Sequence, residues 1–387
     1  MTNTETRIDA DAVEAFAGRV LSDFAGAAGT AMTIIGDRLG LYDALTGAGP
    51  LEAGELARRT RLHPRLVTEW LAAQTVCGYV LHDPLLDTYE LPVEHAMALS
   101  VVASPAYVIG AAEVIAGQYA TLGDLQSAFR GNGGIDYGCF PDTVMHGIER
   151  FFSTAYTHQL AQTWFPAVDG LVERLDDGAR VADVGCGHGA ATLLMARTWP
   201  RSTFTGFDLD EPSITVARAR AADAGAPANI GFRVADAAGI APGPFDVVVF
   251  FDALHDLGDP VAALRRAHEL LTPGGILVAV EPWSTDRLED GIDNPIARID
   301  YAVSTSMCTP TSLAQPGGYG LGTCGGPARR LRLLSEAGFV ESRLAADTGH
   351  NLVLTARAGA PAYVGVGGSA GITGPAACSR RPPPATG

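Results

Sequence analysis

The chain of 387 residues contains no lysine, so its 27 strongly basic side chains are all arginine. Against them stand 43 acidic residues, which gives a net charge of −16 at pH 7. Such a charge repels nucleic-acid phosphates unless a local basic stripe opposes it. The densest arginine groups, around Arg58–Arg65 and Arg329–Arg332, are both short. We therefore expect no nucleic acid among the partners of this protein.

Cysteine is also scarce, and its six copies lie far apart with no C-x-x-C spacing. This spacing excludes a disulfide framework and a zinc ligand set, and the nine histidines show no clustered ligand spacing either. No residue is therefore assigned as a metal ligand, and the use of a metal stays undetermined by the sequence. A bilayer-spanning apolar run is absent too, and the polar, acidic start from Met1 to Ala10 lacks the regions of a signal peptide. We expect a cytoplasmic protein without a membrane partner.

Residues 1–100 are predicted to form a helical domain with a winged helix. Apolar side chains recur at helical spacing from Val13 to Phe24. The stretch 51–60, a turn at His63-Pro64 and a helix over Pro64–Val76 predict a helix-turn-helix. Short β-prone runs at 79–81 and 88–91 predict the hairpin that would be its wing.

The rest of the chain divides into three predicted parts. Residues 101–176 read as a helical linker, and residues 359–387, rich in Gly, Ala and Pro, read as a disordered tail. Between them, in residues 177–358, short β-branched runs alternate with helical stretches, which is typical of an α/β fold with a largely parallel sheet. Seven strands are expected there, at Arg180–Val184, Thr203–Phe207, Ile230–Val234, Asp246–Phe251, Ile276–Val280, Val340–Leu344 and Asn351–Thr355.

The strongest local signal is Val181-Ala-Asp-Val-Gly-Cys-Gly-His-Gly, a buried strand that ends in a glycine-rich turn before a helix. Gly185, Gly187 and Gly189 permit positive φ and let a ligand approach the backbone closely. The next strand ends at Asp208, where a carboxylate can accept hydrogen bonds from both hydroxyls of a ribose. To this point a dinucleotide-binding oxidoreductase explains the pattern equally well.

Three features favour an adenosyl amino acid over a dinucleotide. Asp183 stands two residues before the first glycine, where it can reach an ammonium group but would repel a pyrophosphate. Asp236, just past the third strand, can accept a hydrogen bond from the amine of an adenine. The last two strands, after one final helix, suggest that an antiparallel hairpin closes the sheet.

With these motifs in order, residues 180–358 resemble the class I methyltransferases, which use S-adenosylmethionine (SAM). Their D-x-G-x-G-x-G motif is Asp183-Val-Gly-Cys-Gly-His-Gly here, and Asp252-Ala-Leu-His-Asp256 resembles their fourth motif in a bacterial winged-helix subfamily that acts on small molecules. The resemblance implies a Rossmann-like seven-stranded sheet, a homodimer formed through the N-terminal domain, and a set of cofactor contacts. That set comprises Asp183, Gly185, Cys186, Gly187, Gly189, Asp208, Leu209, Asp236, Ala237, Phe251, Asp252, Ala253 and Asp256.

His255 and Glu281 are the candidate catalytic residues. His255 follows the fourth strand, at the edge where open α/β sheets bind ligands, and it could act as a general base or only line the adenosyl pocket. Glu281 ends the fifth strand, and Asp256 could orient the imidazole or cap a helix. The predicted function is methyl transfer to an O, N or C atom of a small organic molecule, with a place in secondary metabolism.

Three further interpretations stay open. A SAM-responsive transcription regulator would use the winged helix on DNA, although the helix 64–76 offers few phosphate contacts. Tyr301, Met307 and Cys308 either line an acceptor pocket or belong to the core. The glycine-rich stretch within residues 305–326 is interpreted either as a mobile flap, a lid or gate over the site, or as a disordered segment.

Overall fold

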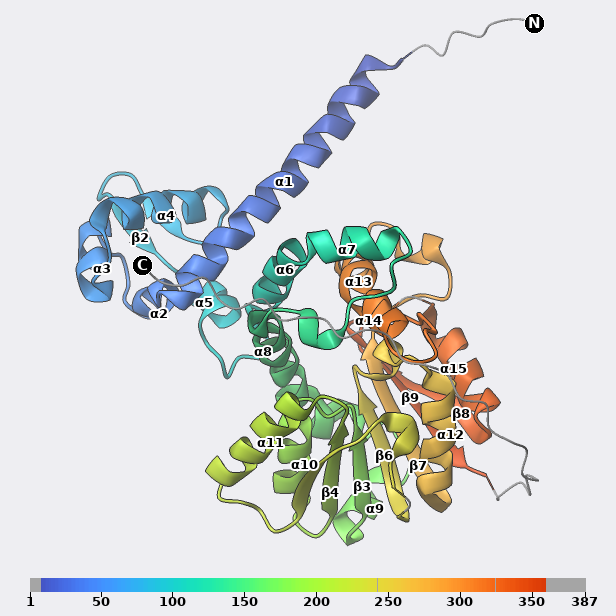
Figure 1. Cartoon of the computed structure of the whole chain (residues 1–387). Coiled ribbons are helices and arrows are strands. Elements are labelled where there is room, and N and C mark those ends of the chain that lie inside the picture. The colour runs from blue at the N-terminus through green and yellow to red at the C-terminus, as the bar shows by residue number, and fades with distance from the viewer. Residues whose placement is uncertain (1–7, 242, 324, 360–387) are drawn as a thin grey trace, which may run out of the picture. The chain divides into compact units, whose positions relative to one another are not determined.

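The computed structural model of the chain (Figure 1) describes residues 8–241, 243–323 and 325–359. The disordered tail predicted for 359–387 lies, apart from Gly359, outside these residues. The chain divides into two compact units. The first comprises Met1–Ala116 and His146–Thr154, and the second comprises Gly117–Met145 and Ala155–Gly387. Residues of the predicted linker 101–176 contribute to both units, and the predicted domain boundaries stay a prediction.

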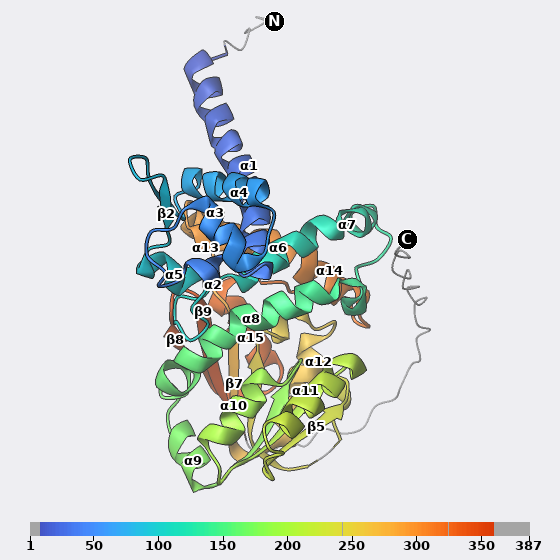
Figure 2. The same ribbon diagram turned by 90° about the vertical axis from the view of Figure 1, so that its left-hand side faces the viewer.

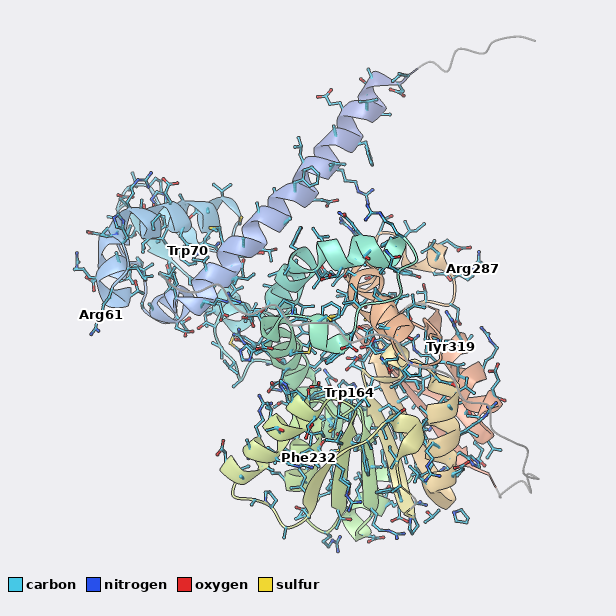
Figure 3. All side chains as sticks on the ribbon, viewed as in Figure 1. Arg61, Trp70, Trp164, Phe232, Arg287 and Tyr319 are labelled. Carbon is cyan, nitrogen blue, oxygen red and sulfur yellow. The ribbon has the colours of Figure 1, made fainter. Side chains whose placement is uncertain are left out.

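The first unit is a winged helix preceded by a long helix, as the sequence predicts. Trp70 of the helix-turn-helix packs edge-on against Tyr42, and its indole Nε1 donates to the backbone oxygen of Met32 at 2.8 Å (Figure 3). The elements of the first unit are the helices α1 (Ala10–Arg38), α2 (Leu41–Leu45), α3 (Ala53–Thr60), α4 (Pro64–Val76) and α5 (Val93–Leu99), and the wing strands β1 (Leu81–Asp83) and β2 (Thr88–Glu90).

Helix α1 begins at an Asp9 cap and runs for 29 residues. Its N-terminal half extends beyond helices α2 to α4 in both views (Figures 1 and 2). Of the side chains from Ile8 to Phe24, all but that of Val20 are exposed, including Phe16 and Phe24, each at about two thirds. This half of α1 thus leaves an apolar stripe in water.

Three arginines of the winged helix form ion pairs with carboxylates of their own helices. Arg58 and Arg59 both bind Glu55, and Arg65 pairs with Glu69 one turn away. In these pairs the carboxylates neutralise the arginine charges that would otherwise bind the phosphates of a nucleic acid.

None of the helices in the described ranges is long and apolar enough to cross a membrane, and the expected cytoplasmic location stays a prediction.

The second unit contains the seven-stranded sheet, with the strand order β5-β4-β3-β6-β7-β9-β8. Strands β3 to β7 run parallel, and β8 and β9 form the antiparallel closing hairpin that the sequence predicts. All seven predicted strands are confirmed. Their bounds are β3 (Arg180–Val184), β4 (Thr203–Asp208), β5 (Ile230–Val234), β6 (Phe245–Phe251), β7 (Leu271–Pro282), β8 (Phe339–Asp347) and β9 (Asn351–Ala358).

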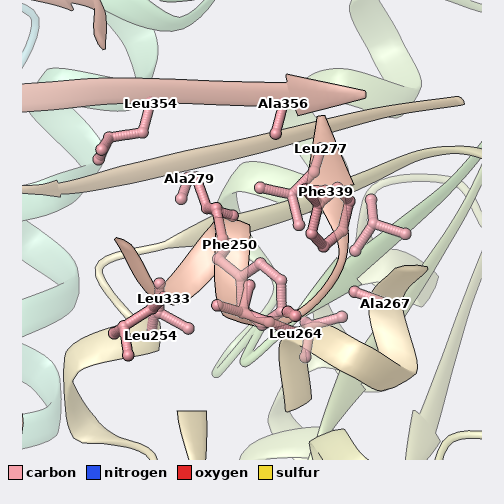
Figure 4. Packing of buried hydrophobic residues seen from close by; sticks show 14 of the residues in the cluster. Phe250, Leu254, Leu264, Ala267, Leu277, Ala279, Leu333, Phe339, Leu354 and Ala356 are labelled. Carbon is pink, nitrogen blue, oxygen red and sulfur yellow. The ribbon is translucent and has the colours of Figure 1, made fainter. Parts of the chain in front are cut away.

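Helices cover both faces of the sheet because its central strands are apolar on both sides. Phe250 points to one face and packs with Leu264 of α12 and Leu333 of α15 (Figure 4). Val249 points to the other, toward Leu175 of α9 and Met195 of α10. The helices concerned are α9 (Leu171–Asp177), α10 (Ala190–Thr198), α11 (Glu211–Asp223), α12 (Pro260–Leu270) and α15 (Gly326–Glu336).

The remaining elements are short or span the two units. Helix α6 (Gly110–Ala120) and helix α8 (Asp142–Gln159) each have residues in both units. Within the second unit lie α7 (Leu122–Phe129), α13 (Pro295–Val303), α14 (Thr309–Ala314) and single turns at η1 (Tyr137–Cys139), η2 (Leu160–Trp164), η3 (Ala237–Gly239), η4 (Leu254–Asp256), η5 (Leu288–Gly291) and η6 (Ser304–Cys308).

Candidate active site

The glycine turn after β3 is built as the sequence predicts, with positive φ at Gly185, Gly187 and Gly189. A Cβ atom at Gly185 would lie 2.6 Å from that of Ala253, and one at Gly189 would lie 2.6 Å from the ring of Phe232 (labelled in Figure 3). At Gly187 a Cβ would meet no atom within 4 Å among the described residues. Two of the glycines therefore serve packing as well as the turn, whereas Gly187 leaves open space.

Asp208, at the end of β4, is fixed beside this turn. Its carboxylate accepts hydrogen bonds from the backbone N–H of Gly187 at 2.8 Å and of Asp210 at 2.9 Å. Burial raises the pKa of this carboxyl, and the two N–H donors partly offset the rise. Each oxygen retains a lone pair, so the held carboxylate can accept two further hydrogen bonds.

Asp183, inside β3, is almost completely buried behind the same turn. Its Oδ2 accepts a hydrogen bond from the Thr192 hydroxyl at 2.6 Å, while no donor among the described residues reaches Oδ1. Burial raises the pKa of this carboxyl to about 7, although the bond from Thr192 lowers it. An unsatisfied buried oxygen costs about 1–3 kcal/mol, which a ligand that supplies a proton donor would recover.

The other predicted cofactor residues also follow the carboxyl ends of the strands. Asp236 is exposed and caps η3 through the N–H of Ala238, and Leu209 is 58% exposed. Phe251, in contrast, packs in the core against Trp164 and Phe165. The remaining members, Cys186, Ala237, Asp252, Ala253 and Asp256, are buried or half-buried. Their contact with a cofactor stays a prediction.

Asp252 stands out among them because its backbone is strained, with φ at +49°. Both carboxyl oxygens are buried, and neither has a hydrogen-bond partner in the described part of the chain. Burial raises the pKa of this carboxyl well above its usual value, and the nearby Glu281 adds to the rise. Strain and missing partners together make Asp252 a candidate functional position.

His255 and Glu281, the two predicted catalytic residues, form a buried pair. The imidazole Nδ1 lies 2.9 Å from Glu281 Oε2, and Glu281 Oε1 accepts the N–H of Leu254 at 3.0 Å. The other ring nitrogen, Nε2, lies 3.2 Å from Asp256 Oδ1. Burial alone would lower the pKa of His255, but Asp256 and Glu281 outweigh it and raise the pKa well above its usual value.

Arg330 and Asp300 also lie at this site, and no sequence pattern predicted either of them there. The Arg330 guanidinium, 1% exposed, lies 3.6 Å from Glu281 Oε2 and donates to Ser284 and Thr323. Asp300 on α13 lies within electrostatic reach of both His255 and Arg330, and burial raises the pKa of its carboxyl to about 7. No motif connects these positions, because helices α13 and α15 bring them to β7 only in the folded chain.

Tyr137 and Cys308 are further residues near His255. The Tyr137 hydroxyl lies within reach of the Asp256 and Asp208 charges, and burial raises its pKa. The Cys308 thiol lies within 4.8 Å of ligand atoms of both His255 and Asp256, and burial raises its pKa to about 12. Cys308 therefore faces the site, as the sequence allowed, and is buried there.

The predicted flap contains two helical elements, and its action as a mobile lid or gate stays a prediction. Residues 304–314 form η6 and α14, and three groups from this segment and the residues after it bond to the loop that carries His255. Ser312 donates to the backbone oxygen of Leu257 at 2.7 Å, and Gln315 donates to that of Asp256 at 2.7 Å. The N–H of Gly322 reaches the backbone oxygen of His255 at 3.1 Å. The glycines thus allow residues 304–322, called the strap below, to turn tightly around this loop. Sequence periodicity alone could not distinguish such a strap from a mobile loop.

Family models match two parts of the chain. Residues 175–308 match a methyltransferase domain, and residues 27–101 match an Rv2258c-like winged HTH domain. The chain is 37% identical over 105 residues to the ubiquinone biosynthesis O-methyltransferase of Caulobacter sp. strain K31, and 39% identical over 103 residues to that of Xanthomonas euvesicatoria pv. vesicatoria. These matches cover 26% of the chain and 40% and 41% of those proteins, so the chain spans less than half the length of the curated relatives it matches.

Solved structures agree over most of the chain. Human N-acetylserotonin methyltransferase in complex with SAM superposes with a TM-score of 0.66 at 18% identity, covering 93% of this chain and all of that one. The mitomycin 7-O-methyltransferase MmcR gives 0.66 at 19% identity, covering 90% and 99%. At these identities the likeness shows the fold. The chain therefore has a winged-helix domain and a methyltransferase domain with the Rossmann-like sheet that the sequence predicts.

Proposed function

We propose that the protein is a SAM-dependent methyltransferase that acts on a small organic molecule. The observation that carries this proposal is the Asp208 carboxylate fixed against the open Gly187 turn at the carboxyl edge of a methyltransferase sheet. A ribose would take the lone pairs of Asp208, and the cofactor's ammonium group would lie toward the unsatisfied oxygen of Asp183. The residues present thus fit SAM, which supplies a methyl group activated by its sulfonium.

The residues around His255 handle the proton of the acceptor. Methyl transfer forms the bond from acceptor to carbon as the bond from carbon to sulfur breaks, which requires the acceptor atom to carry a free electron pair. Glu281 holds Nδ1, so Nε2 is the nitrogen that shares a proton with the acceptor. The acceptor either passes its proton to Nε2 or binds already ionised. In both cases an imidazolium stabilised by Glu281 lies beside the acceptor atom.

An oxygen acceptor is the form of this activity that the comparisons support best. The named relatives include ubiquinone biosynthesis and mitomycin O-methyltransferases, and a neighbour from neocarzinostatin biosynthesis was solved with 1,4-dihydroxy-2-naphthoic acid. That neighbour gives a TM-score of 0.59 at 18% identity, over 88% of this chain and 98% of its own. We propose a hydroxylated ring compound as acceptor, in the biosynthesis of a secondary metabolite.

Thermal unfolding in the presence of ligands tests the cofactor. We expect S-adenosylhomocysteine (SAH) at about a hundred times its Kd to stabilise the protein by about 2.7 kcal/mol, which raises Tm by a few degrees. NAD at the same concentration should leave Tm unchanged, because Asp183 would repel its pyrophosphate. A shift with NAD and none with SAH would end the proposal and restore the oxidoreductase interpretation.

We further propose that two copies associate through α1. The exposed Val13, Phe16 and Phe24, with half-buried Val20, recur at spacings of three and four residues, and a lone helix with such a stripe in water is unstable. A second copy buries the stripe symmetrically.

Sedimentation equilibrium is expected to give a dimer for the full chain. Replacing both Phe16 and Phe24 with Glu should shift the dissociation constant at least about a hundredfold, since each buried Phe is worth roughly 1.5–3 kcal/mol. Glu14→Gln, on the same exposed half of α1, is the control and should leave the dimer intact. A monomeric parent chain would refute the association.

A further inference from the structure

Three side chains of different chemistry converge beside the His255–Glu281 pair. Nε2 of His255, a carboxylate oxygen of Asp256 and Sγ of Cys308 lie within 4.8 Å of one another. His255 and Cys308 are each 3% exposed, and Asp256 keeps 23% of its side chain accessible. His255 and Asp256 lie in η4, and Cys308 ends η6. The segment 304–322, which contains η6, is bonded to residues 255–257 through Ser312, Gln315 and Gly322.

We propose that His255, Asp256 and Cys308 bind a divalent transition-metal ion of the zinc type, and that this ion inhibits the enzyme. The binding stands on the geometry of the three side chains alone. The inhibition rests on the proposed function, because the ion takes the Nε2 lone pair that an acceptor would otherwise use.

The donor set selects the class of ion. Imidazole nitrogen, thiolate sulfur and carboxylate oxygen are the ligands of Zn²⁺, whereas Mg²⁺ and Ca²⁺ require oxygen alone. In a tetrahedral zinc site, bonds of about 2.0–2.3 Å place neighbouring ligand atoms about 3.3–3.7 Å apart. The 3.2 Å between Nε2 and Asp256 Oδ1 already matches one edge of that tetrahedron. As the ion binds, the thiol proton of Cys308 and the Nε2 proton of the His255 imidazolium both leave to solvent.

Glu281 fixes the imidazole of His255 on the side away from the proposed ion. Metal-binding histidines donate their second ring N–H to a carboxylate or carbonyl, which fixes the ring and strengthens the metal bond. Here Nδ1 lies 2.9 Å from Glu281 Oε2, and Arg330 and the N–H of Leu254 hold that carboxylate in turn. The imidazole therefore presents Nε2 in the fixed orientation that a metal ligand needs.

An unsatisfied oxygen also points to a ligand at this place. Asp256 Oδ1 is buried and has no hydrogen-bond partner among the described residues. A bound cation would give this oxygen a partner, and the three protein ligands leave the fourth position of the ion for water.

Cobalt titration of the full chain without SAM tests the binding. Co²⁺ replaces Zn²⁺ in such sites and absorbs light when a thiolate binds it. We expect one Co²⁺ per chain, a near-ultraviolet thiolate band, and displacement by Zn²⁺. Cys308→Ser should remove the band and weaken binding at least about tenfold, and Glu281→Gln should weaken it about tenfold or more while the band persists.

Cys77→Ser is the matched control, because Cys77 is an exposed thiol of the first unit. Its spectrum should equal that of the parent chain. SAH binding by Cys308→Ser, measured by thermal shift, shows that the variant is folded. A band that survives Cys308→Ser, or no band in the parent chain, overturns the site.

Zinc titration of methyl transfer tests the inhibition separately. We expect stoichiometric Zn²⁺ to abolish SAH formation and a chelator to restore it. A rate that rises with Zn²⁺ overturns the inhibitory role. A chain that binds Co²⁺ but not SAH refutes the proposed function and leaves the metal site standing, so the two failures are distinguishable.

Discussion

Asp208→Ala is expected to weaken SAH binding about a hundredfold. Two hydrogen bonds from a ribose to a carboxylate are worth roughly 1.5–3 kcal/mol each, and the loss of about 3 kcal/mol corresponds to about a hundredfold in Kd. The substitution also releases the N–H of Gly187, which Asp208 holds at 2.8 Å, so the turn loses part of its fixed shape. Isothermal titration calorimetry with SAH measures this effect without knowledge of the acceptor.

Asp223→Ala supplies the control, since Asp223 is an exposed carboxylate at the end of the helix that follows Asp208. Its Kd for SAH should match that of the parent chain, which excludes a general effect of removing negative charge. An unchanged Kd for Asp208→Ala would contradict the assignment of the ribose site and remove the main support for SAM.

Replacement of His255 is expected to lower the rate of methyl transfer about 10²- to 10⁴-fold, the usual contribution of a positioned proton-transfer group. The assay measures SAH formation with whichever compound of a hydroxylated ring panel, including 1,4-dihydroxy-2-naphthoic acid and N-acetylserotonin, supports turnover. Glu281→Gln should lower the rate about 10²-fold, because the amide cannot stabilise the imidazolium. Both variants should keep their affinity for SAH within about threefold.

The pair acts as a unit, so the two substitutions should not be additive. With His255→Ala in place, Glu281→Gln should cost little more, and a double-mutant cycle measures the coupling. His350→Gln, which changes an exposed histidine, serves as control. Additive losses, or a full rate in His255→Ala, would show that the acceptor's proton does not pass through this pair.

Sequence and structure agree best where the determinants are local. The seven strands, the glycine turn and the placement of Asp208 follow from β-branched runs bounded by glycine and proline, because alternation and turn chemistry act over a few residues. The wing and the helix-turn-helix are equally local. The strap at residues 304–322 shows the limit, because its glycines indicated a turn-rich segment but not the buried partners that hold it.

By itself, then, the sequence determined where the seven strands lie along the chain, the glycine turn after β3 and the position of Asp208 beside it, since each depends on neighbours along the chain. Only the tertiary structure decided that Glu281 holds His255, that Arg330 supports Glu281, and that Cys308 lies against Asp256. These partners stand tens of residues apart and come from different strands and helices. Packing across the sheet sets their distances, and no pattern in one sequence records it.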